Sequence, residues 1–379
     1  MQVWTPNFQR NLQWILGLPF DAITLEGAVD AVRQSAAIGT RLFISTPNLN
    51  FLIASQRDQA FASSVVHSDL SLPDGMPIVW LARLFGMPIT ERVAGSSLFE
   101  ALNLPLATNV QTPLRVFFFG GPEGAGQAAS DAMNARVGGG MRCVGFLSPG
   151  FGSVADMSTP AIIDRINQSS ADFLVVALGA SKGQAWIEHN LPRLNPPVVS
   201  HLGAVINFAG GSIKRAPVWV QKLGLEWVWR VKEEPTLWRR YWNDGLSFLN
   251  MIVTQAIPLA LLIRRMKAKG VLEQPCHCSA EAVGDALVVR WKGPLTHTKA
   301  GPLYERFTSA LAQELQVELD LSHCTYVDMD VIPHIAAVHM RQRLTLRRLT
   351  ISSASPAVTS IFRLANAPFS VGAVDQASK

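Results

Sequence analysis

The sequence predicts an α/β fold, in which a parallel β-sheet is covered by helices on both faces. Apolar runs of strand length alternate with helix-like stretches, and glycine-containing turns separate several of them. The 379 residues suffice for two or three domains. We place the boundaries at residues 1–213 for the sheet domain, 214–270 for a basic and apolar appendage, and 271–379 for a small second α/β domain.

The strands of the first domain are apolar throughout rather than alternating, which is typical of strands buried on both faces. Helix-like stretches are expected from Phe51 and at 127–136, 159–167 and 183–190. Ligands of such sheets bind beyond the carboxyl ends of the strands. The predicted strands span residues 41–45, 114–119, 141–146, 173–178 and 198–202.

The composition narrows the class of protein. With 48% hydrophobic and 16% charged residues, the chain is too apolar to be disordered, and we expect some apolar surface to meet lipid or a partner. Its four cysteines are too scattered for a disulfide framework. Cys276-His277-Cys278 lacks a second ligand pair, so incidental thiols are favoured over zinc. The first twenty residues contain no apolar run typical of a signal peptide.

The appendage is basic and rich in tryptophan. Residues 214–269 contain eleven Lys or Arg against four acidic residues, a net charge of +7. Residues 246–263 carry no formal charge, which favours a helix lying in a membrane interface; a true span and a core or oligomer-interface helix stay open. Pro258 should kink this helix near Thr254. No nucleic-acid-binding module is recognisable, so nucleic acid is not an expected partner.

Asp74 is the leading candidate for a general base. It lies in Leu72-Pro73-Asp74-Gly75-Met76, between a Thr46-Pro47-Asn48 turn and Glu91-Arg92-Val93-Ala94-Gly95-Ser96. One carboxylate, small polar groups and one guanidinium at three loops are what a single-base transferase needs. The alternative for Asp74 is a helix cap or an Asp-Gly turn, and for Thr46 and Asn48 it is turn formation. Arg92 suits a diphosphate, with a surface ion pair as its alternative.

The turn that begins Gly120-Gly121 precedes a helix and suits a nucleotide or diphosphate, because free N–H groups and the helix dipole favour anions. A nicotinamide site is disfavoured, since Pro122 intrudes in the turn and no acidic residue follows the next predicted strand. The glycines alternatively serve only to permit a tight turn.

Several motifs follow one another along the chain: Gly17-Leu18-Pro19-Phe20-Asp21, the three loop segments around Asp74, Lys214-Arg215-Ala216-Pro217, Leu225-Glu226-Trp227, Glu234-Pro235 and Trp238-Arg239-Arg240-Tyr241. Together they resemble the WecG/TagA/CpsF glycosyltransferases. That resemblance implies a Rossmann-like domain that transfers a sugar, with inversion and without a metal or cofactor, from a UDP-sugar to an undecaprenyl-diphosphate-linked saccharide. The sugar implied is N-acetylmannosamine, its uronic acid or a related hexose such as glucose. It also implies a peripheral protein at the cytoplasmic face of the bacterial inner membrane, in exopolysaccharide or cell-envelope glycan biosynthesis.

The resemblance also implies roles for individual residues. Asp74 is the expected base, supported by Thr46 and Asn48. The expected contacts to the donor and its diphosphate are Arg92, Gly120, Gly121, Lys182, Gln184 and Arg215. The expected cations on the acceptor and membrane side are Arg230, Arg239 and Arg240.

One stretch departs from the family pattern. Where the family has Gly-x-Pro-Lys-Gln-Glu-x-Trp, this chain has Gly179-Ala180-Ser181-Lys182-Gly183-Gln184-Ala185-Trp186, and Asn207 replaces a usual aspartate. These changes alter which sugar hydroxyls can be held. An alternative hypothesis is a weakened or inactive member that acts as a scaffold in a polysaccharide assembly complex.

The third domain resembles a STAS domain. The strand, helix and strand expected at 285–291, 298–314 and 316–321 lead into Val327-Asp328, with a further strand at 348–352 and a helix at 356–366. Met329 occupies the position of the switch serine, so phosphorylation there is excluded. We expect an element that docks a protein partner or self-associates.

Overall fold

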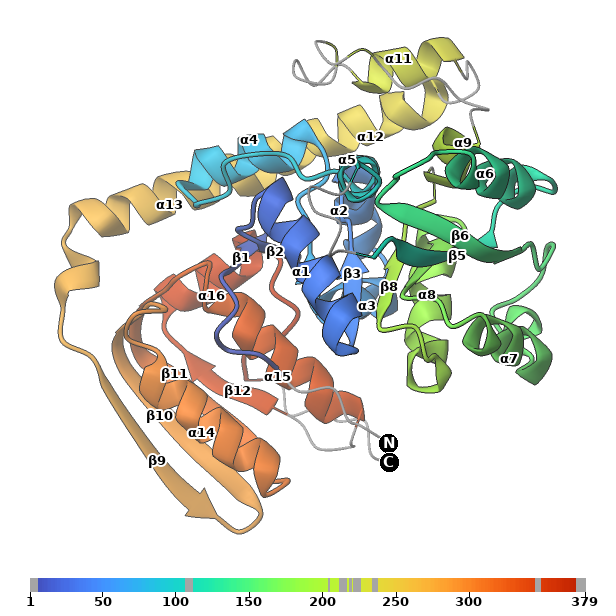
Figure 1. Cartoon of the computed structure of the whole chain (residues 1–379). Coiled ribbons are helices and arrows are strands. Elements are labelled where there is room, and N and C mark those ends of the chain that lie inside the picture. Colours follow the sequence, from blue (N-terminus) through green and yellow to red (C-terminus); the bar gives the residue numbers. More distant parts are fainter. Residues whose placement is uncertain are drawn as a thin grey trace.

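The computed structural model contains a large parallel sheet, a small mixed sheet and a long helix that runs across both domains (Figure 1). It describes residues 6–105, 112–203, 205–210, 217, 220, 226–233, 238–344 and 349–372. The large sheet has the strand order β4-β3-β8-β7-β5-β6, and all its pairings are parallel. Its strands are β3 (Leu42–Ser45), β4 (Leu70–Ser71), β5 (Leu114–Gly120), β6 (Met141–Leu147), β7 (Phe173–Ala177) and β8 (Val198–His201).

Both faces of the large sheet are buried, which confirms the predicted fold and explains the unbroken apolar runs. In β5, Val116 and Phe118 face one core, whereas Phe117 and Phe119 face the other. The first core is covered by α1 (Leu25–Ile38), α5 (Gly95–Leu102), α6 (Ala125–Asn134) and α9 (Val205–Ala209). The second is covered by η1 (Asp156–Ser158), α7 (Pro160–Gln168), α8 (Ala180–Asn190) and η2 (Leu191–Arg193).

An antiparallel hairpin, β1 (Leu12–Ile15) and β2 (Leu18–Asp21), lies between the two domains. The Trp14 backbone N–H donates to Met329 O at 2.8 Å, and its Nε1–H donates to Ala365 O at 2.9 Å. Gly17 closes the hairpin with φ +112°, and a Cβ there would lie 2.8 Å from Nδ2 of Asn366. The hairpin was not predicted, because its residues are buried from both sides and show no alternating pattern.

Three helices complete the interface around the hairpin. They are α2 (Leu49–Ser55), α3 (Gln59–Val66) and α4 (Met76–Phe85). One continuous apolar cluster includes side chains from these helices, from the hairpin and from the small domain. The two domains therefore share a core, and the fold positions one against the other.

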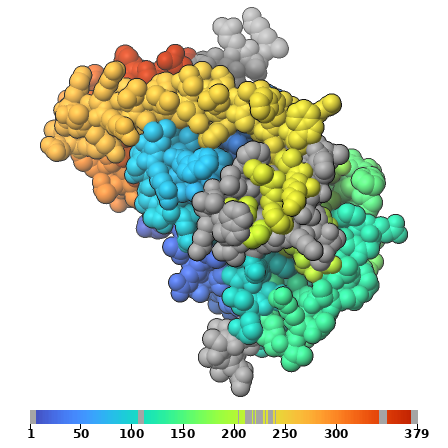
Figure 2. Space-filling model, turned by 90° about the horizontal axis from the view of Figure 1, so that it is seen from above, coloured from blue at the N-terminus to red at the C-terminus, as the bar shows by residue number. Residues whose placement is uncertain are grey.

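A long helical run crosses the molecule as α12 (Trp238–Met251), a π-helical turn η4 (Ile252–Ala256) and α13 (Ile257–Ala268), preceded by α11 (Glu226–Glu233). Pro258 lacks an N–H for the carbonyl of Thr254, and the Ile257 N–H bonds to Ile252 O, five residues back. The irregularity predicted near Thr254 is thus a π-turn. Figure 2 shows this run along one face of the molecule, with α4 beside it.

The small domain has a four-stranded sheet in the order β12-β11-β10-β9, in which only β9 runs antiparallel to its neighbour. This confirms the predicted second α/β domain; the exact domain boundaries stay predictions. Its elements are η5 (Val271–Glu273), β9 (His277–Val283), β10 (Ala286–Leu295), α14 (Gly301–Ala312), β11 (Gln316–Val327), α15 (Ile332–Leu344), β12 (Leu349–Ala354) and α16 (Pro356–Leu364).

Candidate active site

Three loops at the carboxyl edge of the large sheet are joined by backbone hydrogen bonds. Leu72 N–H donates to Ser45 O at 2.8 Å, and Asp74 N–H donates to Pro47 O at 3.1 Å. The third loop joins the second through Val93 N–H and Pro73 O, at 2.9 Å. The three segments singled out in the sequence therefore form one surface, although about fifty residues separate the first from the last.

Asp74 follows the short strand β4 and is partly exposed. Gly75 separates it from α4 and occupies the N-cap position with φ +107°, a conformation that glycine adopts readily. The cap of α4 is therefore Gly75, and Asp74 stands one residue before it. This placement, on a loop fixed from two sides, suits a carboxylate that acts on a ligand above the sheet.

Thr46 and Asn48 lie in the loop that pairs with the Asp74 loop. Thr46 is buried, and a Cβ on Gly95 would lie 2.4 Å from Cδ2 of Leu202 and 3.2 Å from Cγ2 of Thr46, which explains the glycine at the start of α5. Asn48 is the N-cap of α2, and its Oδ1 accepts from Asn50 N at 3.0 Å and Phe51 N at 3.2 Å. The turn-forming alternative for Asn48 is thus confirmed, while its side-chain amide keeps donor capacity for a ligand.

Arg92 lies one residue before Val93, in the third loop, and is half-buried. Its neighbour Glu91 accepts a hydrogen bond from Leu25 N at 2.8 Å and so tethers the loop to the start of α1. The loop is fixed by Glu91 and Val93 on either side of the guanidinium. Arg92 is thereby placed beside the loop of Asp74.

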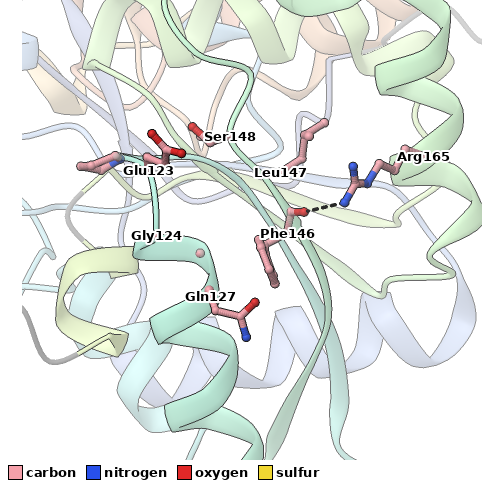
Figure 3. A pocket seen from close by; sticks show the side chains of 10 residues that line it. Glu123, Gly124, Gln127, Phe146, Leu147, Ser148 and Arg165 are labelled. Atoms are coloured by element: carbon pink, nitrogen blue, oxygen red, sulfur yellow. Dashed lines mark hydrogen bonds between the residues drawn. The ribbon is translucent and has the colours of Figure 1, made fainter.

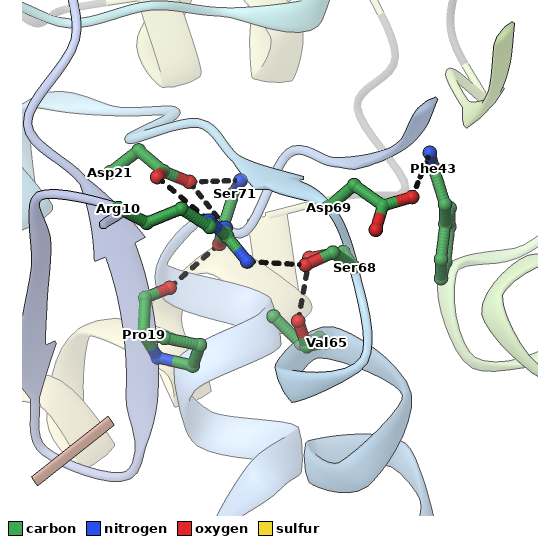
Figure 4. Close-up of polar contacts among 8 residues, drawn as sticks. All are labelled: Arg10, Pro19, Asp21, Phe43, Val65, Ser68, Asp69 and Ser71. Carbon is green, nitrogen blue, oxygen red and sulfur yellow. Dashed lines mark hydrogen bonds and ion pairs between the residues drawn. The ribbon is translucent and has the colours of Figure 1, made fainter. Parts of the chain in front are cut away.

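A buried ion pair between Arg10 and Asp21 holds the strand that precedes the Asp74 loop (Figure 4). No role for these two residues was predicted from the sequence. The Asp21 carboxylate pairs with Arg10 at 2.6 Å and accepts from Ser71 N, in β4, at 2.6 Å. Arg10 also donates to Ser68 O at 2.7 Å. Asp21 ends the Gly17–Asp21 motif, so the motif holds the hairpin against the strand that carries Asp74.

A pocket of about 190 Å³ opens at the carboxyl ends of β5 and β6 (Figure 3). Gly120 and Gly121 form the turn above β5 with φ +100° and +82°, and a Cβ on Gly120 would lie 2.7 Å from Ala177 O. The Gly121 N–H donates to Ala177 O at 2.8 Å. The pocket is lined by Gly120, Pro122, Glu123, Gly124, Gly126, Gln127, Phe146, Leu147, Ser148 and Arg165.

Lys182 and Gln184 lie on α8 and do not line this pocket. Lys182 Nζ donates to Gly152 O at 2.9 Å, so it is tied to the loop after β6. Gln184 is fully buried and donates to Ser45 Oγ at 2.8 Å, while its Oε1 has no hydrogen-bond partner among the described residues. In this structure Gln184 supports the end of β3; its predicted contact to the donor stays a prediction.

The predicted cations of the appendage are placed only in part. Arg239 is exposed on α12, with its guanidinium carbon 5.6 Å from the ring centroid of Trp238. Arg230 lies in α11 and Arg240 in α12, and their side chains are outside the described residues, as is the whole of Arg215. Helix α12 contacts α2, so the appendage reaches the helix that Asn48 caps. Within the described ranges no three His, Cys, Asp or Glu side chains gather in a group that would hold a metal ion, Cys276 and Cys278 included.

The comparisons with known proteins cover both domains. The model of the "Glycosyl transferase WecG/TagA/CpsF family" matches residues 13–260, and that of the "Mlab, STAS domain" matches residues 278–367. Two similar proteins are the N-acetylglucosaminyldiphosphoundecaprenol N-acetyl-beta-D-mannosaminyltransferases of Bacillus spizizenii and Bacillus subtilis. They are 31% and 30% identical over 52% of this chain, which is 74% and 73% of their own lengths. The Staphylococcus aureus protein of the same name is 25% identical over 57% of this chain and 82% of its own.

Proposed function

We propose, from the premise that this chain belongs to the WecG/TagA/CpsF family of glycosyl transferases, that it moves a sugar from a UDP-sugar to an undecaprenyl-diphosphate-linked saccharide, with inversion and without a metal. The joining of three loops around Asp74 by backbone hydrogen bonds is the observation that carries the proposal. The similar proteins named above act, by their names, on a diphosphoundecaprenol-linked sugar.

Each part of the site has a task in this reaction. An acceptor hydroxyl oxygen attacks the anomeric carbon of the donor, its proton passes to the Asp74 carboxylate, and the bond from that carbon to the diphosphate breaks, leaving UDP with the electron pair. Arg92 stabilises the charge that develops on the diphosphate, together with N–H groups of the glycine turn other than that of Gly121, which donates to Ala177 O. The pocket beside Gly120 and Gly121 receives the nucleotide, as expected at the carboxyl ends of parallel strands.

The exposed face of α12 and α13 supports docking on a membrane surface. Residues 241–268 are long and apolar enough to cross a membrane by length and composition, and 28% of the most apolar window is buried in the protein. Because Met251, Leu259 and Ile263 on the inner face are committed to the core, we propose that the helix lies in the interface rather than across it. The exposed face consists of Trp238, Trp242, Leu246, Leu249, Val253, Ile257 and Leu261, between 43% and 64% exposed.

Cations flank this apolar face. Arg239 lies at one end, and Arg264, Arg265, Lys267 and Lys269 lie at the other. Such an arrangement favours an anionic lipid surface, as at the cytoplasmic face of a bacterial inner membrane. An acceptor anchored in that membrane would present its diphosphate near Arg239, on the helix that contacts α2.

The transfer itself is tested with purified protein, a synthetic undecaprenyl-diphosphate-linked saccharide and a panel of UDP-sugars that includes UDP-N-acetylmannosamine, its uronic acid and UDP-glucose. We expect UDP release with one donor, undiminished by EDTA, and a product whose anomeric configuration is opposite to that of the donor. Activity abolished by EDTA and restored by Mg²⁺ would contradict the metal-independent mechanism. No UDP release with any donor and acceptor pair would favour the scaffold hypothesis instead.

Membrane docking is tested by flotation with anionic vesicles. Deleting the helix would remove core side chains, so the informative variant is Leu249→Ser with Val253→Ser, both on the exposed face. We expect this variant to lose most of its flotation. Ile38→Ser with Val137→Ser changes two apolar residues elsewhere that are more exposed than Leu249 and Val253, and this variant should float like the wild type. Equal flotation of both variants would contradict the proposal.

A further inference from the structure

His201 lies at the carboxyl edge of the large sheet, between the two halves of the candidate site. It ends β8, which pairs with β3 on one side and with β7 on the other. The loop of Thr46 follows β3, and the glycine-turn pocket lies beyond β7, above β5. The His201 side chain is 7% exposed, and its ring centroid is 6.2 Å from that of Phe51 on α2. The ring therefore lies on the edge between the glycine-turn pocket and the loop of Thr46, the two parts of the candidate site that a bound donor would span.

Gly183 makes the space that this ring occupies. A Cβ on Gly183 would lie 2.2 Å from Cδ2 of His201, closer than real Cβ atoms approach another heavy atom. Only glycine therefore fits on α8 opposite the ring as it stands. Position 183 is also where the sequence departs from the family pattern, with glycine in place of glutamine. Gly183 and His201 therefore depend on each other. Where the family pattern has a glutamine side chain on α8, this chain has the imidazole of His201 as the polar group.

The hydrogen bond of the ring defines its chemistry. Nε2 lies 2.6 Å from Leu178 O, and because a carbonyl oxygen only accepts, Nε2 carries the proton. Burial lowers the pKa of His201, which keeps the imidazole neutral near pH 7. Nδ1 then holds a lone pair and has no hydrogen-bond partner in the part of the chain that the structure describes. Since Cδ2 faces Gly183, the Nδ1–Cε1 side of the ring is directed away from α8.

We propose that His201 is a specificity-determining residue, whose Nδ1 accepts a hydrogen bond from a hydroxyl or amide N–H of the sugar in the UDP-sugar donor. This inference rests on the proposed function, because its ligand is the donor of that reaction. A nearly buried acceptor favours sugars that place a donor group there, since a sugar without one leaves the nitrogen unpaired. UDP alone, which lacks the sugar, has no group for this acceptor.

Two substitutions separate the two nitrogens. His201→Gln places an amide N–H near the position of Nε2 and so keeps a donor for Leu178 O, but it supplies no acceptor at Nδ1. His201→Asn places its amide near Nδ1 and can offer an acceptor there, but it does not reach Leu178 O. We expect His201→Gln to raise the KM of the preferred UDP-sugar about tenfold with UDP affinity unchanged, and His201→Asn to raise it about threefold or less. The readouts are donor KM and kcat from UDP release, and the Kd of UDP from calorimetry.

Gly183→Ala tests the arrangement from the other side, because its methyl group would displace the ring. It should raise the donor KM as His201→Gln does, and the double variant should show no further increase. An unchanged KM in His201→Gln, or a UDP affinity that falls by the same factor, would overturn the inference while the wild-type turnover upholds the proposed function. A wild-type protein that neither binds UDP nor turns over any donor would overturn both.

Discussion

The carboxyl edges of the large sheet and of the small sheet both carry aspartates, but the surroundings of these aspartates are opposite. In the large sheet, Asp74 follows β4, is partly exposed and stands in a surface formed by three loops, on the same carboxyl edge that carries the pocket at β5 and β6. In the small sheet, Asp328 and Asp330 follow β11, where the hairpin and the segment before it cover the edge. The edge of the large sheet is open for a ligand, whereas the edge of the small sheet packs against another segment of the same chain.

The covering of the small sheet is specific. The backbone of Met329 accepts a hydrogen bond from Trp14, and Phe8 stacks on Tyr304 with ring centroids 4.9 Å apart. Burial and the neighbouring Asp328 raise the pKa of Asp330 to about 7, with burial the larger cause. The edge where a STAS domain would carry its switch serine is therefore occupied by the same chain. A protein partner or self-association through this domain stays a prediction, and it would have to use another surface.

The contrast teaches that strand position alone does not identify a site. Both edges present carboxylates beyond the ends of parallel strands, which is the general location of ligand sites. What distinguishes them is whether another element of the chain fills the space above. At the open edge the hairpin passes beneath the loop of Asp74 and holds it through Asp21, whereas at the closed edge it lies on Met329 itself.

The largest expected effect concerns the closed edge. Trp14→Ala should lower the free energy of unfolding by about 3–5 kcal/mol, because it removes a fully buried indole and its bond to Ala365 O. The affinity for UDP at the open edge should change less than twofold. Trp80→Ala, at a tryptophan that is 48% exposed, is the control and should cost less than about 1 kcal/mol. The free energy of unfolding is measured by denaturant unfolding and the UDP affinity by calorimetry. A loss of UDP binding without a loss of stability would contradict the proposal that the closed edge stabilises the fold and the open edge binds the ligand.

The next effect concerns the link between hairpin and open edge. Asp21→Asn should cost about 3 kcal/mol, since it leaves the largely buried Arg10 without its counter-charge. It should also lower kcat more than UDP affinity, because a neutral amide oxygen accepts more weakly from Ser71 N than the carboxylate does, and the anchor of β4 and the Asp74 loop is weakened. The control is Glu281→Gln, whose pair with Arg290 is exposed and worth about 0–1 kcal/mol. Full kcat in a destabilised Asp21→Asn protein would show that the anchor does not position Asp74.

The smallest effect is a pH dependence at the closed edge. The pKa of Asp330 is raised to about 7 in the folded protein. Between about pH 4 and 7 the Asp330 carboxyl is therefore protonated in the folded protein, whereas in the unfolded chain it has lost its proton. This contribution to stability is full below about pH 4 and is lost as the pH rises through about 7. Asp330→Asn cannot lose it, so the stability of the variant relative to the wild type should rise between pH 4 and 7. A difference that stays constant over that range in thermal melts would contradict the raised pKa.

Comparison with the wild type is needed because His334 opposes this trend. Burial lowers its pKa to about 3, so its contribution is present above about pH 6.5 and is lost as the pH falls. The two groups act with opposite sign across the same range. Subtracting the wild-type curve removes the His334 contribution and isolates that of Asp330.

The sequence was sufficient where local pattern determines structure. Strands such as β5 and β7 were predicted within one residue, because strands buried on both faces are continuous apolar runs. The edge strand β9 and the hairpin were not predicted. Strand β9 is exposed along most of its length, and the hairpin is buried from two sides. The residues of these strands do not indicate which other elements pack against them.

The same limit applies to the candidate site. Asp74 and Arg92 were assigned from residue type, loop position and resemblance, and the structure places their loops side by side. The burial of Gln184 against Ser45 was not predicted, because the direction of a helix face over a sheet depends on long-range packing; the contact of Gln184 to the donor stays a prediction. The anchoring role of Asp21 and the position of His201 depend on strand order, which no local pattern reveals.

The central claim, that Asp74 is the base of a sugar transfer at the open edge, is tested most directly by UDP release from Asp74→Asn. With saturating donor and lipid-linked acceptor, we expect kcat to fall by about 10²–10⁴, while UDP affinity stays within twofold of the wild type. Asp164→Asn, at an exposed carboxylate on α7, should retain full activity. An Asp74→Asn protein that releases UDP at the wild-type rate would contradict the role of Asp74 as the general base.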